Sequence, residues 1–333
     1  MKTGSFKDGS FPPSLLTSGI ALTYLILIAS NLRWKHIGDL FVSSKKRQPK
    51  QLPVTVVEGD SPKEKNDSTK KKIIVVLLHG MWHNASYFSN LQKILKQNGY
   101  TSYAIDLLPG ERLFPGFSQT EIVSDLENTL LQYTKTKDHS QQNVEFILVG
   151  HSQGGLIAQS CLLNSSRLKT HTKATILLGS FPLGLTPPIQ LLFQPQNMYN
   201  HFGYLGICLT GRLWTHKYLK HIFLLPSTDV NKSARLQTYA QKILNAPSDG
   251  LITMSHFPQN VNIISTKPTL ILGADQDIIY PPQFLQKSFK DRFPNSDHII
   301  IPNQAHCFMD PVNDGEMCME DSLISWLDNL FAK

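Results

Sequence analysis

The chain has 333 residues, of which 41 % are hydrophobic, enough for one large α/β domain with additional segments. Its net charge of +7 is confined to the first 72 residues, where 13 Lys and Arg stand against 6 Asp and Glu; the remainder carries 19 of each kind. This neutral body excludes the basic docking face of a nucleic-acid-binding protein. The four cysteines show no CxxC spacing, so we predict no metal site, no cofactor and no disulfide framework, only buried thiols.

The first predicted element is an apolar segment within a stretch that has no charged residue between Asp8 and Arg33. Residues 14–32 have the length that a helix needs to cross a bilayer, and the flank NLRWKH places a Trp between basic residues, as at a membrane interface. We therefore predict an N-terminal tail at 1–13 and a transmembrane anchor at 14–32. A signal peptide or an organelle-targeting leader is the alternative, although such cores are usually shorter and end in an A-x-A-like site.

The flanks of the anchor also predict its orientation. More Lys and Arg follow the segment than precede it, and the positive-inside rule then predicts a cytoplasmic location for the rest of the chain. The sequon Asn84-Ala85-Ser86 agrees, because a glycan there would obstruct the candidate site described below. Residues 33–72 are charged and contain proline, as expected of a basic linker. Within them, LPVTVVE at 52–58 is a candidate edge strand for the following domain.

From Ile73 onward, short apolar runs alternate with helical segments. Each run is apolar almost throughout, which is typical of strands buried on both faces of a parallel sheet. The runs lie at 73–80, 101–108, 144–150, 173–180, 268–275 and 298–302. Stretches between them, such as SNLQKILKQNG, have helical spacing. The alternation predicts one doubly wound α/β domain over 73–333 with a mostly parallel sheet. It breaks only at about 181–267, where abundant Leu, Phe, Tyr, Trp and Pro predict an inserted helical cap.

The most specific motif is Gly150-His151-Ser152-Gln153-Gly154, a G-x-S-x-G pattern between a predicted strand and a predicted helix. A nucleophile on such a sharp turn requires small residues two positions away on either side, so that the turn can close. The N-terminus of the following helix then favours negative charge near the hydroxyl. We therefore predict that Ser152 is a nucleophile and not only a small residue in a tight turn.

A serine hydroxyl needs a base to take its proton, and the base needs a carboxylate to orient it. His306 follows the last predicted strand and precedes a C-terminal helix, so it is the expected base. Asp277 lies in mid-loop after the preceding strand and is favoured as the carboxylate. Asp275 is the alternative, although we expect it to finish the strand and to cap it.

The oxyanion of an acyl-transfer reaction needs two hydrogen-bond donors. We expect one to be the backbone N–H of Gln153, directly after the serine, and the other to be the backbone N–H of Met81. The dipeptide His79-Gly80 would form the turn that aims the second donor. His83 could serve as a substrate contact or as an ordinary surface or supporting histidine, and the sequence does not separate these interpretations.

Four motifs together resemble the α/β-hydrolase superfamily: strand-HG-x-W, G-H-S-Q-G-G, a late G-x-x-x-D-x-x-x-P and a final A-H before a C-terminal helix. The chain order Ser152, Asp277, His306 is the order of nucleophile, acid and histidine in that superfamily. HGMWHNASYF is similar to the HG-x-W loop of small esterases and hydroxynitrile lyases, and AHCFMDP resembles the H-x-M-M-x-D ending of lysophospholipase-like members. The resemblance covers about residues 73–333 and implies an α/β-hydrolase fold with its lid at the insertion.

The resemblance and the expected triad imply a serine carboxylic-ester hydrolase that works through an acyl-enzyme. The apolar cap and the anchor favour a lipidic or acyl-chain ester as substrate, with the membrane as the partner of the N-terminal helix. Three alternatives stay open. An acyltransferase would pass the acyl group to an alcohol or amine, and a lyase would use the serine and histidine as acid and base. An inactive membrane-tethered binding module would keep only the fold.

Overall fold

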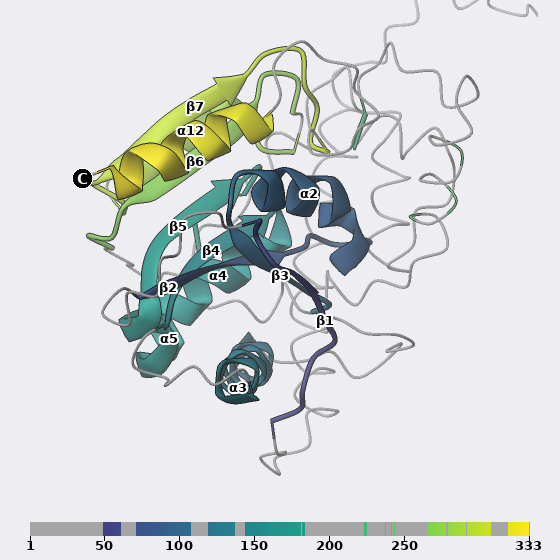
Figure 1. The fold of residues 1–333 in the computed structure, drawn as a ribbon. Coiled ribbons are helices and arrows are strands. Elements are labelled where there is room, and N and C mark those ends of the chain that lie inside the picture. The colour runs from purple at the N-terminus through teal and green to yellow at the C-terminus, as the bar shows by residue number, and fades with distance from the viewer. Residues whose placement is uncertain are drawn as a thin grey trace, which may run out of the picture.

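The computed structural model describes the central domain in most of its length (Figure 1). The described residues are 49–60, 71–107, 119–136, 144–180, 182–183, 223–224, 237, 241, 243, 265–277, 279–290, 292–307 and 319–332. The predicted tail and anchor, and nearly all of the predicted cap at 181–267, lie outside these residues. In the part of the chain that the structure describes, no helix combines the length and the apolarity needed to cross a bilayer.

The domain is built on a seven-stranded sheet with the order β1-β3-β2-β4-β5-β6-β7. Only β1 is antiparallel; the other neighbouring pairs are parallel. The strands are β1 Val54–Val57, β2 Lys72–Leu78, β3 Thr101–Ile105, β4 Val144–His151, β5 Thr172–Leu178, β6 Thr269–Ala274 and β7 Ser296–Ile301. The predicted doubly wound, mostly parallel sheet is therefore confirmed.

The edge strand β1 was a candidate from the sequence and is confirmed. It pairs with β3, and Leu52 just before it is buried in the core. Part of the segment that the sequence assigns to a basic linker, 33–72, thus belongs to the sheet. The charged residues at 61–70 separate this strand from the apolar runs that begin at residue 73, and the strand itself is short and only partly buried. For both reasons the sequence pattern placed it within the linker.

Helices cover both faces of the sheet, and alternate residues of each strand contribute to two separate hydrophobic cores. In β2, Ile74, Val76 and Leu78 belong to one core, whereas Val75 and Leu77 belong to the other. The helices are η1 Ala85–Phe88, α2 Ser89–Gln97, α3 Gln119–Thr136, α4 Gln153–Asn164, α5 Ser166–His171, α11 Pro282–Lys290 and α12 Met319–Phe331.

The first core is closed by α3, α4 and α11, and the second by α2 and α12. Figure 1 shows α12 lying along β6 and β7. Burial of every central strand on both faces explains why their sequences do not alternate between apolar and polar residues.

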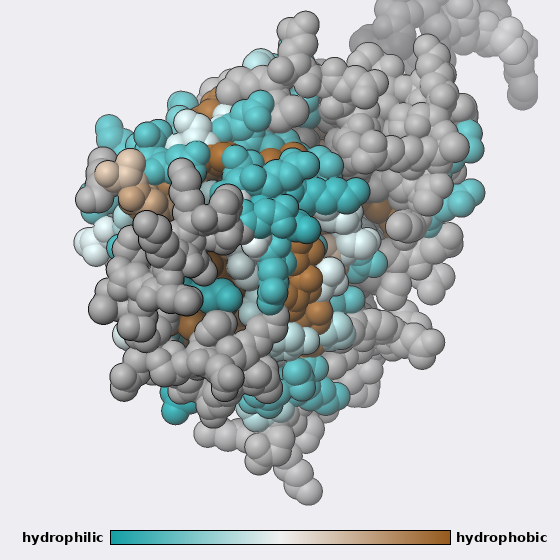
Figure 2. Space-filling view, in the orientation of Figure 1, coloured by the Kyte–Doolittle hydropathy of each residue, from teal (hydrophilic) through white to brown (hydrophobic). Residues whose placement is uncertain are grey.

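Helix α2 illustrates how these helices bury one side only. Leu91 and Leu95 are fully buried and four residues apart, while Lys93 and Gln97 on the opposite side are exposed. Figure 2 shows the resulting hydrophilic surface over α2. Gly99, which the sequence marks as the end of this helix, has φ +82° and closes it in the left-handed conformation that glycine tolerates.

Candidate active site

Ser152 lies on the sharp turn between β4 and α4, in a backbone conformation that few residues adopt. Its φ is 52° and its ψ is −118°, and its N–H donates to the carbonyl of Leu178 at 2.9 Å. A non-glycine residue at positive φ is strained, and such strain concentrates at functional positions. The turn also needs Gly154, because a Cβ there would lie 2.0 Å from the carbonyl oxygen of Leu78. This close approach explains why the sequence has a residue without a side chain at position 154.

His306 and Asp277 form a buried pair. His306 Nδ1 lies 2.8 Å from Asp277 Oδ2, and the two residues are 1 % and 3 % exposed. The second oxygen of Asp277 accepts hydrogen bonds from the backbone N–H groups of Ile279 and Tyr280, at 2.8 and 2.9 Å. Both carboxylate oxygens thus accept hydrogen bonds. Because Nδ1 faces this carboxylate, Nδ1 carries a proton and Nε2 is the ring nitrogen left to act as a base.

Asp275, the alternative carboxylate, contacts the backbone of the loop after β7. It is exposed, and its Oδ1 accepts the backbone N–H of Gln304 at 3.1 Å. The N–H of Gln276 in turn donates to the carbonyl of Gln304 at 2.9 Å. These bonds join the loop after β6 to the loop after β7. Strand β6 ends at Ala274, so Asp275 follows the strand and does not finish it as expected from the sequence.

Two aromatic side chains connect Ser152 with His306. The imidazole of His151, next to the serine, donates from Nε2 to the carbonyl oxygen of His306 at 3.0 Å. The ring of Tyr280 lies 5.3 Å from the ring of His306. Burial raises the pKa of the Tyr280 phenol, Asp277 raises it further, and a hydrogen bond with the Ser152 hydroxyl acts in the opposite direction. Ser152 and the His306–Asp277 pair therefore share two neighbours, His151 and Tyr280.

His151 is an uncharged part of this site. It is completely buried, and burial lowers its pKa well below the ordinary value, with His306 and His83 nearby lowering it further. The sequence motif names this position only as a variable residue of G-x-S-x-G, so no signal in the sequence pointed to its contact with the loop of His306.

The two expected oxyanion donors belong to segments on either side of Ser152. Gln153 is the first residue of α4, where backbone N–H groups point out of the helix. Met81 lies in a turn after β2 whose Gly80 would place a Cβ 2.9 Å from the Cβ of Ser152. The turn that carries Met81 thus approaches the serine at Gly80, which is 72 positions away from Ser152 in the sequence.

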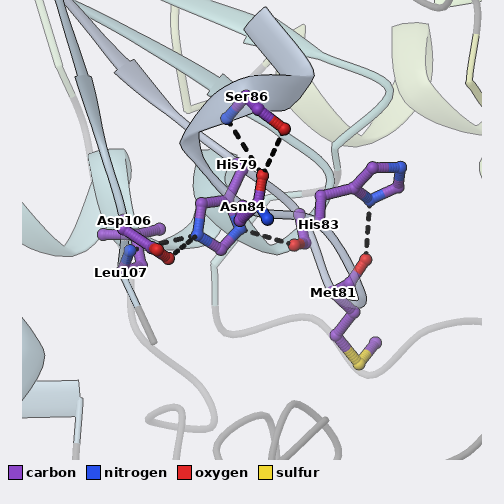
Figure 3. Close-up of polar contacts among 8 residues, drawn as sticks. His79, Met81, His83, Asn84, Ser86, Asp106 and Leu107 are labelled. Atoms are coloured by element: carbon purple, nitrogen blue, oxygen red, sulfur yellow. Dashed lines mark hydrogen bonds and ion pairs between the residues drawn. The ribbon is translucent and has the colours of Figure 1, made fainter. Parts of the chain in front are cut away.

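His79 fixes the start of this turn, as Figure 3 shows. It is 2 % exposed, and its Nδ1 donates to the carbonyl of Gly80 at 2.8 Å. Its Nε2 accepts the backbone N–H of Leu107 at 3.0 Å, with Asp106 Oδ1 at 3.3 Å. These contacts tie the end of β2 to the end of β3. The sequence assigned His79-Gly80 to a turn, and the contacts explain how the turn is held.

An aromatic side chain of the insertion packs against His306. The ring of Phe223, in the insertion after β5, lies 5.7 Å from the rings of both His306 and Trp82. The carbonyl of Phe223 also accepts the backbone N–H of Cys307 at 3.1 Å. A described part of the insertion therefore touches the loop that carries His306.

Within the described ranges, no group of three or more His, Cys, Asp and Glu is arranged to hold a metal ion. Cys161 and Cys307 are both buried, and neither is part of a disulfide. Burial raises the pKa of Cys161, with the nearby Glu127 as a smaller cause.

Comparison with known proteins gives the same fold. The chain matches the fold of an esterase from Thermogutta terrifontis over 87 % of this chain and 97 % of that one, at 17 % identity and a TM-score of 0.62. An esterase from Exiguobacterium antarcticum matches at 19 % identity and a TM-score of 0.56, covering 83 % and 95 %. A bromoperoxidase from Bacillus anthracis matches at 17 % and 0.56, covering 85 % and 96 %.

No curated protein sequence matches the chain. At the identities given above, the similar structures show the fold alone and not the reaction. The model of the alpha/beta hydrolase family, in contrast, matches residues 75–315, which is most of the chain and includes the turn of Met81, the Ser152 turn and both loops of the His306–Asp277 pair. The chain therefore belongs to the α/β-hydrolase family.

Proposed function

We propose that this protein is a serine carboxylic-ester hydrolase. The observation that carries the proposal is the buried His306–Asp277 pair, with its 2.8 Å contact, beside a serine at φ 52°. Ser152 Oγ attacks the acyl carbonyl and passes its proton to Nε2 of His306. Asp277 keeps the proton of His306 on Nδ1 and stabilises the imidazolium that forms. Collapse of the tetrahedral intermediate expels the alcohol, which takes the proton from His306, and water then cleaves the acyl-enzyme by the same steps.

The oxyanion of each tetrahedral intermediate would be held by the backbone N–H groups of Gln153 and Met81. Two features support this assignment: the position of Gln153 at the first turn of α4, and the close approach of the Gly80 turn to Ser152. Donors that are fixed before the reaction stabilise the oxyanion without reorganisation, and each contributes about 10²- to 10³-fold in kcat.

The substrate would be a lipidic or acyl-chain ester. The rings of Phe223 and Tyr280 pack beside that of His306, and the ring of Trp82 packs on Phe223; these aromatic side chains favour an apolar acyl group. The apolar composition of residues 181–267 supports the same interpretation. Two of the similar structures are esterases, which supports an ester rather than another acyl compound.

Substitution Ser152→Ala tests the proposal. We expect hydrolysis of p-nitrophenyl esters to fall by at least about 10³-fold, because no other hydroxyl replaces the nucleophile. The midpoint of thermal unfolding should be retained, since the replaced side chain contributes only its hydroxyl. A panel from acetyl to octanoyl esters would show whether acyl length matters. Full activity in Ser152→Ala would rule out the proposed reaction.

We further propose that residues 14–32 anchor the protein in a membrane with the hydrolase domain on the cytoplasmic side. The support is the uncharged stretch of this length and the excess of Lys and Arg after it. Asn84 of the sequon is exposed and adjoins the Met81 turn, so a glycan there would stand beside the site. Removal of residues 1–42 should release the domain from the membrane fraction; a truncated protein that still pellets with membranes would contradict the anchor.

A further inference from the structure

His83 belongs to the turn that carries Met81, and it makes two hydrogen bonds within that turn. Its backbone N–H donates to the carbonyl of Gly80 at 3.4 Å, and its imidazole Nδ1 donates to the carbonyl of Met81 at 2.7 Å. Figure 3 shows the ring turned back onto the Met81 carbonyl. The residue enclosed by these bonds is Trp82, at φ 60°. The bond between His83 and Gly80 closes a four-residue turn in which Trp82 is the third residue. A third residue at positive φ is usually Gly, because a side chain strains that conformation.

The other side of the ring reaches the loop of the base. His83 Nε2 lies 3.7 Å from the Sγ of Cys307, the residue that follows His306. Because Nδ1 donates to a carbonyl, Nε2 is the acceptor and the thiol is the donor. The side chain of His83 therefore joins the turn of Met81 to the loop of His306, over a sequence separation of 224 residues.

Neighbouring rings fix the orientation of this imidazole. The ring of Tyr87 lies 4.2 Å from it, and the rings of His151 and Phe223 each lie 5.8 Å away at 87°. Close aromatic packing on several sides leaves a single rotamer. A fixed ring can transmit the position of one loop to the other.

His83 is neutral over the working pH range. Burial lowers its pKa to about 3; the hydrogen bond to the Met81 carbonyl opposes this, and His79 and His306 lower the pKa further. The bond from Nδ1 to Met81 therefore keeps the same donor and acceptor between pH 6 and pH 9.

We propose that His83 is a positioning residue of the oxyanion site. It holds the strained turn from Gly80 to His83, and with it the N–H of Met81, in register with Ser152. The proposal rests on the ester hydrolase proposed above. It assigns His83 no contact with the reacting atoms and no charge in the reaction.

Two variants separate the hydrogen bond from the packing. His83→Phe keeps an aromatic ring but removes both nitrogen atoms, whereas His83→Asn retains a donor near the position of Nδ1. For His83→Phe we expect kcat to fall by about 10²-fold with KM changed by less than about threefold, because an oxyanion donor acts mainly on the transition state. His83→Asn should recover at least about tenfold of that loss. The ratio of variant to wild-type kcat should stay constant between pH 6 and pH 9.

Hydrogen exchange supplies a second readout that needs no turnover. We expect the amides of residues 80–84 to exchange faster in His83→Phe and to return toward the wild-type rate in His83→Asn. A variant that fails to fold would lose protection throughout the domain, and His83→Asn would then carry the test. Wild-type exchange and kcat in His83→Phe, or equal kcat in the two variants, would overturn the proposal.

Failure of the two proposals can be told apart. A wild-type protein that neither hydrolyses esters nor reacts with a fluorophosphonate at Ser152 would refute the hydrolase, and with it the role of His83 in catalysis. A wild-type protein that does both, together with His83 variants that match it, would refute the positioning role alone.

Discussion

The hydrogen bonds of Asp277 predict the effect of replacing it with asparagine. One carboxylate oxygen accepts two backbone N–H groups, those of Ile279 and Tyr280, and the other accepts Nδ1 of His306. Asparagine has one oxygen and one NH₂ group. With the oxygen toward the two backbone donors, two bonds survive and the NH₂ group faces His306. With the amide reversed, only the bond from His306 to the amide oxygen survives. The NH₂ group then faces the backbone N–H groups of Ile279 and Tyr280, which are left without an acceptor.

The cost of leaving a buried donor without an acceptor is about 1–3 kcal/mol. The reversed orientation leaves two such donors, so the first orientation is favoured by about 2 kcal/mol or more, which is at least about 30-fold in population. It forces His306 to accept at Nδ1 and to carry its proton on Nε2. An imidazole in that tautomer cannot take the proton of Ser152. The same change of tautomer in the serine-protease triad lowers kcat by about 10⁴-fold, and we expect a loss of 10³- to 10⁴-fold here, by order of magnitude.

The assay is the turnover of p-nitrophenyl butyrate, with urea unfolding measured in parallel. Because Asp277→Asn keeps both backbone bonds, its free energy of unfolding should fall by no more than about 3 kcal/mol. Asp275→Asn is the matched control: that carboxylate is exposed, and its bond to Gln304 needs only an oxygen, so activity should stay within about threefold of wild type. The reasoning would be refuted by a folded Asp277→Asn protein with more than a tenth of wild-type kcat, or by an Asp275→Asn protein that is equally impaired.

Two further predictions concern stability. Burial lowers the pKa of His83 to about 3. Below about pH 6.5 the unfolded chain therefore binds a proton at His83 that the folded protein does not bind, so the free energy of unfolding decreases as the pH is lowered. Between pH 7 and pH 5 this costs about 2 kcal/mol, which His83→Phe should abolish; an unchanged pH slope of urea unfolding in that variant would contradict it. Gly154→Ala should lose about 3 kcal/mol or more, because its Cβ would lie 2.0 Å from the backbone oxygen of Leu78. Gly273→Ala, whose Cβ meets only the side-chain ends of Ile300 and Leu285 at 3.1 and 3.2 Å, should lose less than about 1 kcal/mol. Equal losses in the two glycine variants, by the same measurement, would show that the close approach at Gly154 is not what limits substitution.

The sheet could be predicted from the sequence because each central strand is a continuous apolar run between turns. Val144–His151, for instance, has seven buried residues and one partly exposed residue, and its short length and the glycine-rich turn after it favour a strand over a helix. The position of the loops that carry Ser152, Asp277 and His306 at one edge of the sheet could also be predicted. Parallel strands end at the same edge of the sheet, so the loops that follow them are neighbours whatever their separation in the chain.

The supporting histidines could not be predicted, since their partners are distant in the sequence. His151 contacts the carbonyl of His306, and His83 contacts Cys307; neither partner has a recognisable spacing from its histidine. The positive φ of Trp82 is equally hidden, because a tryptophan gives no indication of the conformation that glycine usually supplies. Local patterns encode elements and turns, whereas these contacts exist only after the loops have met.

The hydrogen bond between the carbonyl of Phe223 and the N–H of Cys307 has a consequence for how substrate range and rate are connected. It makes one peptide of the insertion a structural neighbour of the peptide that follows His306. A substitution that moves residue 223 to make room for a bulkier ester also disturbs the hydrogen bond to the backbone N–H of Cys307, the residue after the expected base His306. If the protein is the ester hydrolase proposed above, a library that varies residue 223 is expected to give variants in which a wider choice of esters accompanies a slower proton transfer to His306.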